Sequence, residues 1–78
     1  MARKIPFNQA GRAKLDFNNG FSVNVIQNPD DKDRCTIILY QNGIIQNEHK
    51  ELSIKDGFVA VNCGKIKRDA LLKQISLF

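Results

Sequence analysis

Apolar and polar residues alternate along two neighbouring stretches near the start of the chain. Residues 12–17 and residues 21–25 each place apolar side chains at every second position, which is the period of a half-buried β-strand. A three-residue loop between them would pair Leu15 with Val23 and keep both apolar sets on one face. That loop length needs a left-handed residue at its third position, where Gly20 stands. The pattern therefore predicts a β-hairpin.

The longest apolar run follows and predicts the central strand of a sheet. Residues 34–41 include the β-branched series Thr36, Ile37 and Ile38, which favours a strand. An uninterrupted apolar run indicates that both faces of the strand seek cover. The dipeptide Asn42-Gly43 then predicts a tight turn, after which residues 44–47 pair back.

A second hairpin is predicted around the dipeptide Asp56-Gly57, which is a two-residue turn signal. A turn of that length would pair Ile54 with Val59 and Leu52 with Val61, apolar against apolar. Residues 58–63 would then form the last strand.

The period changes after Gly64, where residues 65–76 are rich in helix formers. Ile66, Ala70, Leu71 and Ile75 follow helical spacing, so we expect this side of a helix to pack on the sheet. The predicted fold is α+β and mainly β: an antiparallel meander of about five strands, as an open curled sheet or a small barrel, with one C-terminal helix. Residues 1–78 would form one small domain, with 1–11 as a weakly structured arm, 12–63 as the meander and 65–76 as the helix.

Chain length and composition indicate a small single-domain protein without a membrane helix. The 78 residues allow one domain, and a chain this short gains stability by association, so a homodimer is one expected state. No apolar stretch approaches the roughly 20 residues of a membrane helix, and no apolar segment follows the N-terminal charges. We therefore expect a cytoplasmic protein without membrane contact, in which Cys35 and Cys63 are free thiols on strands.

Positive charge is concentrated at the two ends of the chain, although the net charge is only +4. If the ends meet in space, they form a basic patch suited to nucleic acid or to an acidic protein partner. The alternative is that the charge serves solubility alone. The candidate binding residues are Arg3, Lys4, Arg12, Lys14, Gly64, Lys65, Lys67 and Arg68.

The start of the predicted helix is a candidate anion site within that set. Lys65, Lys67 and Arg68 lie in its first turn, where cations oppose the helix dipole. A bound phosphate, held by free backbone amides and these cations, would account for them. The alternative is that solvent screens the charges and nothing binds.

The sheet face opposite the core is a second candidate surface. Strand alternation assigns to it Phe58, several polar or basic residues and either Tyr40 or Leu39; the polar and basic ones are Lys14, Ser22, Asn24 and Lys55. Aromatic side chains among basic residues on a sheet can stack single-stranded bases, so Tyr40 and Phe58 are candidate stacking residues. The alternative is that they cover a second layer or a dimer interface.

Catalytic and metal chemistry find little support. His49 is the only histidine, and no spacing brings a nucleophile to a base. Cys35, Cys63 and His49 lack the short spacings of zinc ligands, and the aspartates at 30, 31 and 33 lack the glycine and glutamate of a calcium-binding loop. We expect no cofactor, no metal and no enzymatic activity.

The sequence thus predicts a small binding module, with nucleic acid as the leading partner. The alternative is a protein–protein interaction module that regulates or inhibits a partner protein. No family motif is evident. A meander followed by a helix is similar in outline to small single-strand-binding dimers and to small inhibitor proteins of mobile elements.

Overall fold

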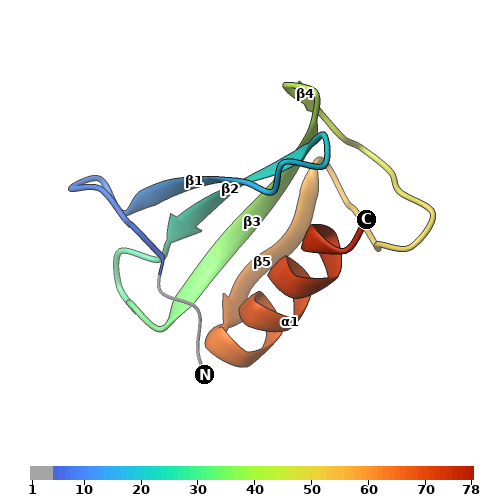
Figure 1. The fold of residues 1–78 in the computed structure, drawn as a ribbon. Coiled ribbons are helices and arrows are strands. Elements are labelled where there is room, and N and C mark those ends of the chain that lie inside the picture. Colours follow the sequence, from blue (N-terminus) through green and yellow to red (C-terminus); the bar gives the residue numbers. More distant parts are fainter. Residues whose placement is uncertain (1–4) are drawn as a thin grey trace.

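An open antiparallel sheet with one C-terminal helix forms the molecule (Figure 1). The computed structural model of the chain describes residues 5–78. The predicted class, α+β and mainly β, is confirmed, and the sheet is open rather than closed into a barrel. The elements are β1 Arg12–Asp16, β2 Phe21–Gln27, β3 Arg34–Gln41, β4 Ile44–Ile45, β5 Phe58–Gly64 and α1 Lys65–Ser76.

The first hairpin forms as the alternation predicts. Leu15 pairs with Val23, and the amide of Phe17 donates to the carbonyl of Phe21 at 3.2 Å. Gly20 has φ +87°, the left-handed conformation that a three-residue loop requires. The loop also reaches the helix, because Asn19 Nδ2 donates to the carbonyl of Ile75 at 3.0 Å. The hairpin therefore contacts the C-terminal end of α1.

Strand β3 is central, and two strands share one of its edges. Its other edge pairs with β2 along the whole of β2. The turn at Asn42-Gly43 has positive φ at both residues and leads into β4, which pairs only with the last two residues of β3. The rest of this edge is taken by β5, which enters the sheet after the long connection of residues 46–57.

The second predicted hairpin is therefore largely wrong. The turn at Asp56-Gly57 exists, with Lys55 and Phe58 in a single β-bridge. Leu52 instead bridges His49, and residues 52–54 are not a strand. The reason is that β4 is too short to cover β3. The uncovered backbone groups of β3 offer β5 a longer and better partner.

A bulge in β5 changes which side chains face the core. The register between β3 and β5 shifts twice, and Asn62 has φ +53°. Cys63 is thereby returned to the interior, whereas Val61, which was predicted to pair with Leu52, is 66% exposed. Three hydrogen bonds hold Asn62: its amide donates to Thr36 Oγ1, its carbonyl accepts from Arg34 Nη1 and its Oδ1 accepts from Asn28 Nδ2.

Asn62→Ala is expected to lower the free energy of unfolding by about 1–2 kcal/mol. Alanine tolerates the left-handed conformation less well than asparagine and cannot accept from Asn28. Asn62→Gly loses the same hydrogen bond without the backbone cost, so its loss should stay below about 1 kcal/mol. Urea unfolding of the two variants checks this order. If glycine costs as much as alanine, the left-handed backbone is not what the position requires.

The helix begins and ends close to the predicted bounds but presents a different side to the sheet. Ile66 is 90% exposed and Ala70 is also exposed, although both were expected to pack inward. The buried helix residues are Arg68, Leu72 and Ile75. Ile75, which was also predicted to pack inward, is fully buried, and Leu71 packs partly buried against the core. Leu72 and Ile75 together bury more apolar surface than Ile66 and Ala70 can.

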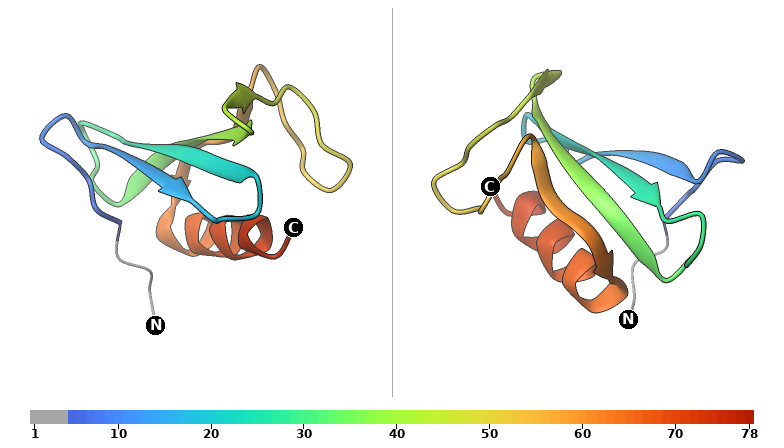
Figure 2. Two further views of the ribbon diagram at one scale, coloured as in Figure 1. Left: turned by 45° about the horizontal axis from the view of Figure 1, so that its top comes forward. Right: turned by 180° about the vertical axis from the view of Figure 1, so that it is seen from behind.

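The molecule has two layers, with the helix on one side of the sheet (Figure 2). We call this side of the sheet the inner face and the opposite side the outer face. The core lies between the layers, and its fully buried members are Val23, Val25, Ile37, Leu39, Leu72 and Ile75. Ile5, in the predicted N-terminal arm, is buried in the same cluster. Within residues 5–78, no helix has the length and apolar character needed to cross a membrane.

Candidate functional site

The outer face of the sheet brings together most of the polar, basic and aromatic residues that strand alternation assigned to it. Residues paired directly across strands share a face. One row across the sheet consists of Lys14 on β1, Asn24 on β2, Ile38 on β3 and Phe58 on β5. A second row carries Asp16, Ser22, Tyr40 and Ile45, and a third carries Arg12, Ile26 and Thr36.

Tyr40 belongs to the outer face, which resolves the choice between it and Leu39. Leu39 is fully buried on the inner face, and the ring of Tyr40 is half-buried. The hydroxyl of Tyr40 accepts a hydrogen bond from Asn24 Nδ2 at 3.3 Å. Phe58 is the partner of Ile38, two residues before Tyr40, so Tyr40 and Phe58 are diagonal neighbours on this face, roughly 7–8 Å apart. The register therefore places two half-buried aromatic residues at neighbouring positions of this face.

The basic residues of β1 border the apolar part of this face. Arg12 and Lys14 are both exposed on the edge strand. A shallow hollow of about 300 Å³ has both of them in its wall together with Ile38 and Tyr40. Lys55, the bridge partner of Phe58, adds a third cation at the edge of the sheet opposite β1. Asp16 is the acidic residue of the three rows, so the outer face is basic on balance.

Known proteins offer no guide to this surface. No family model matches the chain, and neither a curated protein nor a solved structure gave a significant match.

The candidate anion site at the start of α1 is built differently from the prediction. Gly64 is the N-cap, without a side-chain cap on the helix. Lys65 Nζ lies 3.0 Å from Asp33 Oδ1, so an acid of this chain already pairs with it. The hollow beside it, about 670 Å³, is lined by two acids and three cations: Asp31, Asp33, Arg34, Lys65 and Lys67. Both acids pair with cations of this chain, Asp31 with Arg34 and Asp33 with Lys65, so an anion entering there would meet two carboxylates.

Arg68, the third predicted cation, is only 7% exposed. Its Nε and Nη2 lie 2.9 and 2.8 Å from Asp69 Oδ1, so its charge is matched within the fold. Because it is buried and paired, Arg68 belongs to the helix–sheet packing rather than to an open surface. Lys67, in contrast, is exposed and lines the hollow.

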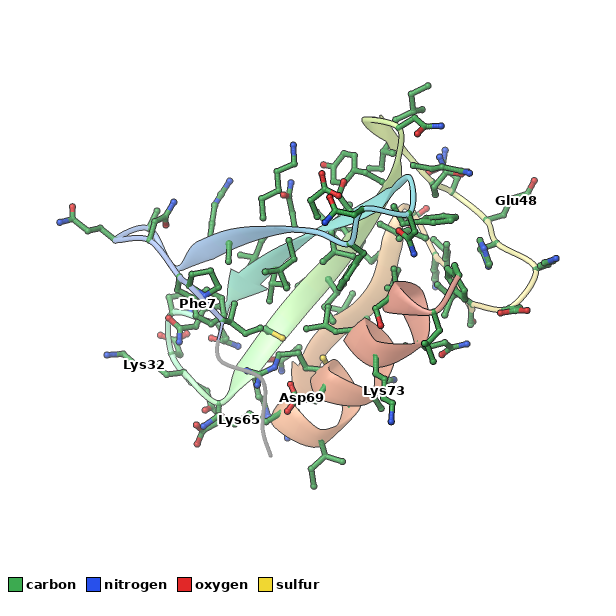
Figure 3. The ribbon with its side chains drawn as sticks, in the orientation of Figure 1. Phe7, Lys32, Glu48, Lys65, Asp69 and Lys73 are labelled. Carbon is green, nitrogen blue, oxygen red and sulfur yellow. The ribbon has the colours of Figure 1, made fainter. Side chains whose placement is uncertain are left out.

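The basic residues of the two chain ends do not share a face in the part of the chain that the structure describes. Arg12 and Lys14 project from the outer face, because the alternate residues Ala13 and Leu15 are buried in the core. Lys65, on the helix, lies on the other side of the sheet (Figure 3). Arg3 and Lys4 lie outside the described residues. The outer face thus combines Arg12 and Lys14 with aromatic side chains.

An aromatic cluster that the sequence did not reveal holds the long connection in place. The ring of His49 stacks on Phe78, with centroids 4.5 Å apart, and both rings meet the edge or face of Phe21. His49 Nδ1 also accepts from the amide of Glu51 at 3.1 Å. The three residues are too far apart in sequence for any local pattern to show the cluster. His49 packs here as an aromatic residue that secures residues 46–57 and the C-terminus.

Cys35 is expected to make the protein less stable at high pH. Burial, with the thiol of Cys63 as a secondary cause, raises the pKa of Cys35 from 9.0 to about 12. The unfolded chain therefore loses this proton first as the pH rises. Stability contributed by the buried thiol is present below pH 9.0 and falls between 9.0 and about 12, by at most about 1.4 kcal/mol per pH unit.

Urea unfolding over that pH range checks the effect, with Cys35→Ala as the comparison. The variant should start from a lower stability and lose less of it as the pH rises. If the free energy of unfolding falls with pH at the same rate in both proteins, groups other than Cys35 account for the loss at alkaline pH.

Proposed function

We propose that the outer face binds single-stranded nucleic acid in the cytoplasm, as a binding module without catalytic activity. The observation that supports this most is the register, which sets Tyr40 and Phe58 side by side with Arg12 and Lys14 at the near edge. Lys65 and Arg68 have no part in the proposed site, since both are paired with acids.

The chemistry of the face suits unpaired bases. Aromatic rings on an open sheet accept stacked bases, at roughly 1–3 kcal/mol per base. Arg12 and Lys14 are placed to neutralise phosphates beside them, and Ser22, Asn24 and Thr36 supply hydrogen-bonding groups between the strands. A duplex keeps its bases inside the helix and cannot stack them on this surface. A preference for single strands follows.

Fluorescence anisotropy with labelled oligonucleotides tests the proposal across a salt series. Single strands should bind more tightly than duplexes of the same sequence. For two or three neutralised phosphates, the logarithm of affinity should fall with the logarithm of salt at a slope of about −1.4 to −2.1. Absence of binding at low salt, or a clear preference for duplex, contradicts the proposal.

Tyr40→Ala and Phe58→Ala are each expected to weaken single-strand binding about 5- to 150-fold. Arg12→Glu combined with Lys14→Glu should weaken it further and flatten the salt dependence. The matched control is Lys67→Glu combined with Lys73→Glu, which makes the same change of charge on exposed helix residues. If the helix variant loses as much affinity as the β1 variant, only net charge matters and the outer face is not the site.

Exposed apolar residues favour a protein partner as the second candidate function. Ile44 and Val61 are 67% and 66% exposed, and Ile45 is also exposed. They belong to β4 and β5, the two strands that share one edge of β3. Ile44→Ser with Val61→Ser should abolish binding to an acidic protein, or dissociate a homodimer in sedimentation, without affecting oligonucleotide binding. If the double variant instead loses oligonucleotide binding and keeps its protein contacts, these apolar residues also serve nucleic-acid binding.

A further inference from the structure

Two buried thiols lie opposite each other at the junction of β3 and β5. Cys35 and Cys63 are direct partners across the two strands, and their Sγ atoms are 3.8 Å apart. Both are free, and they are 4% and 6% exposed. Two register shifts in β5 turn Val61 outward and then return Cys63 to the inner face, where it is paired directly with Cys35.

We infer that Cys35 and Cys63 form a reversible thiol–disulfide couple, a covalent modification site that joins β5 to the centre of the sheet. The oxidant is a small-molecule disulfide of the glutathione class. This inference is independent of the proposed nucleic-acid binding, because the thiols are on the inner face.

The geometry suits a bond between these strands. Directly paired residues of antiparallel strands have Cα atoms about 4.5–5.5 Å apart, within the range of about 4.4–6.8 Å found for disulfides. The sulfurs must approach from 3.8 Å to about 2.05 Å, which side-chain rotation can supply without separating the strands.

The reaction balances as two thiol–disulfide exchanges. One cysteine loses its proton and attacks a sulfur of the small disulfide, which forms a mixed disulfide and releases one small thiol. The second cysteine loses its proton, attacks the cysteine sulfur of that mixed disulfide and releases the other small thiol. Two electrons pass from the cysteine pair to the reagent, and the two protons end on the released thiols. A small-molecule thiol reverses both steps.

Burial of the two thiols slows disulfide formation but does not prevent it at equilibrium. Both sulfurs are covered, so the first exchange requires a local opening. Cys63 is the residue before Gly64, where β5 ends and α1 begins, and Gly64 is half-buried. Opening at this junction would admit the reagent without unfolding the sheet. The second exchange is then fast, because the partner thiol is already in place.

Intact-mass measurement of the full chain in oxidised and reduced glutathione buffers tests the inference. The folded protein should lose two hydrogen atoms and carry no adduct at equilibrium. Its equilibrium constant for oxidation should be at least about tenfold larger than that of the same chain in urea, because folding holds the thiols together. The oxidised protein should unfold at a higher urea concentration than the reduced one.

Cys35→Ser and Cys63→Ser are the controls, and each should show only a glutathione adduct or no change. Three outcomes would overturn the inference. The folded chain could remain a dithiol in buffers that oxidise the chain in urea. A disulfide could form between two molecules instead of within one. Oxidation could lower the urea midpoint, which would show that the strands do not accommodate the bond.

Discussion

Leu72→Ala is expected to lower the free energy of unfolding by about 2–5 kcal/mol, whereas Ile66→Ala should change it by less than about 0.5 kcal/mol. Leu72 is fully buried between helix and sheet, and Ile66 is 90% exposed in the first turn of the same helix. Removing Leu72 leaves a cavity and forfeits its transfer out of water. Removing Ile66 exposes little that was not exposed already.

Urea unfolding of the two variants measures both effects. A chain of this size has a total stability of roughly 4–12 kcal/mol, so the Leu72 variant stands to lose a large part of it. The pair of variants also decides which side of α1 packs on the sheet. If Ile66→Ala proves the more damaging, the helix is rotated relative to the arrangement described here.

Asp69→Asn is expected to cost roughly 2–4 kcal/mol, the second large effect. The side chain of Arg68, on α1, is buried, and its guanidinium donates twice to Asp69 Oδ1. The substitution keeps the shape of the side chain but removes the charge that balances Arg68. Loss of one partner from a buried pair leaves the other charge in a medium that solvates it poorly.

The matched control is Asp33→Asn, which removes the acid of the Lys65 ion pair. Both of those side chains are more than half exposed, so the cost should be below about 1 kcal/mol. A double-mutant cycle of Arg68→Met and Asp69→Ala measures the coupling of the buried pair directly. A coupling energy near zero would show that Arg68 acts through packing of its aliphatic part alone.

The local hairpins show how far the sequence determines the fold. The first hairpin was predictable because alternation, loop length and Gly20 all point to one register. At the second, the turn at Asp56-Gly57 was equally clear, yet only one bridge forms beside it. The deciding factor was the uncovered edge of β3, which is a long-range property that no local pattern records.

The helix was predictable in extent but not in orientation. Ile66 with Ala70 and Leu72 with Ile75 are both pairs at helical spacing. The choice between them depends on the surface of the sheet beneath, and on Arg68 finding a half-buried acid in its neighbour Asp69. A buried arginine runs against the usual preference of charged residues for the surface, so the sequence argues for the other side.

The candidate site was predictable in part for the same physical reasons. Strand alternation placed Lys14, Asn24 and Phe58 together on one face, as the register confirms. It left Tyr40 and Leu39 unresolved, because a continuous apolar run carries no period. Clustering of charge at both chain ends says nothing about which side of a sheet each end occupies. Only the fold separates Arg12 and Lys14 from the cations of α1.

Two-dimensional ¹⁵N NMR can locate the surface of the chain that binds single-stranded nucleic acid. A single-stranded oligonucleotide is titrated into the labelled chain, and the amides that shift locate the binding surface. The outer-face account predicts the largest changes on β1, β2 and β3 around Lys14, Asn24 and Tyr40, and at Phe58, with little change in α1. Shifts concentrated at Gly64 to Lys67, or no saturable shift anywhere, would contradict it.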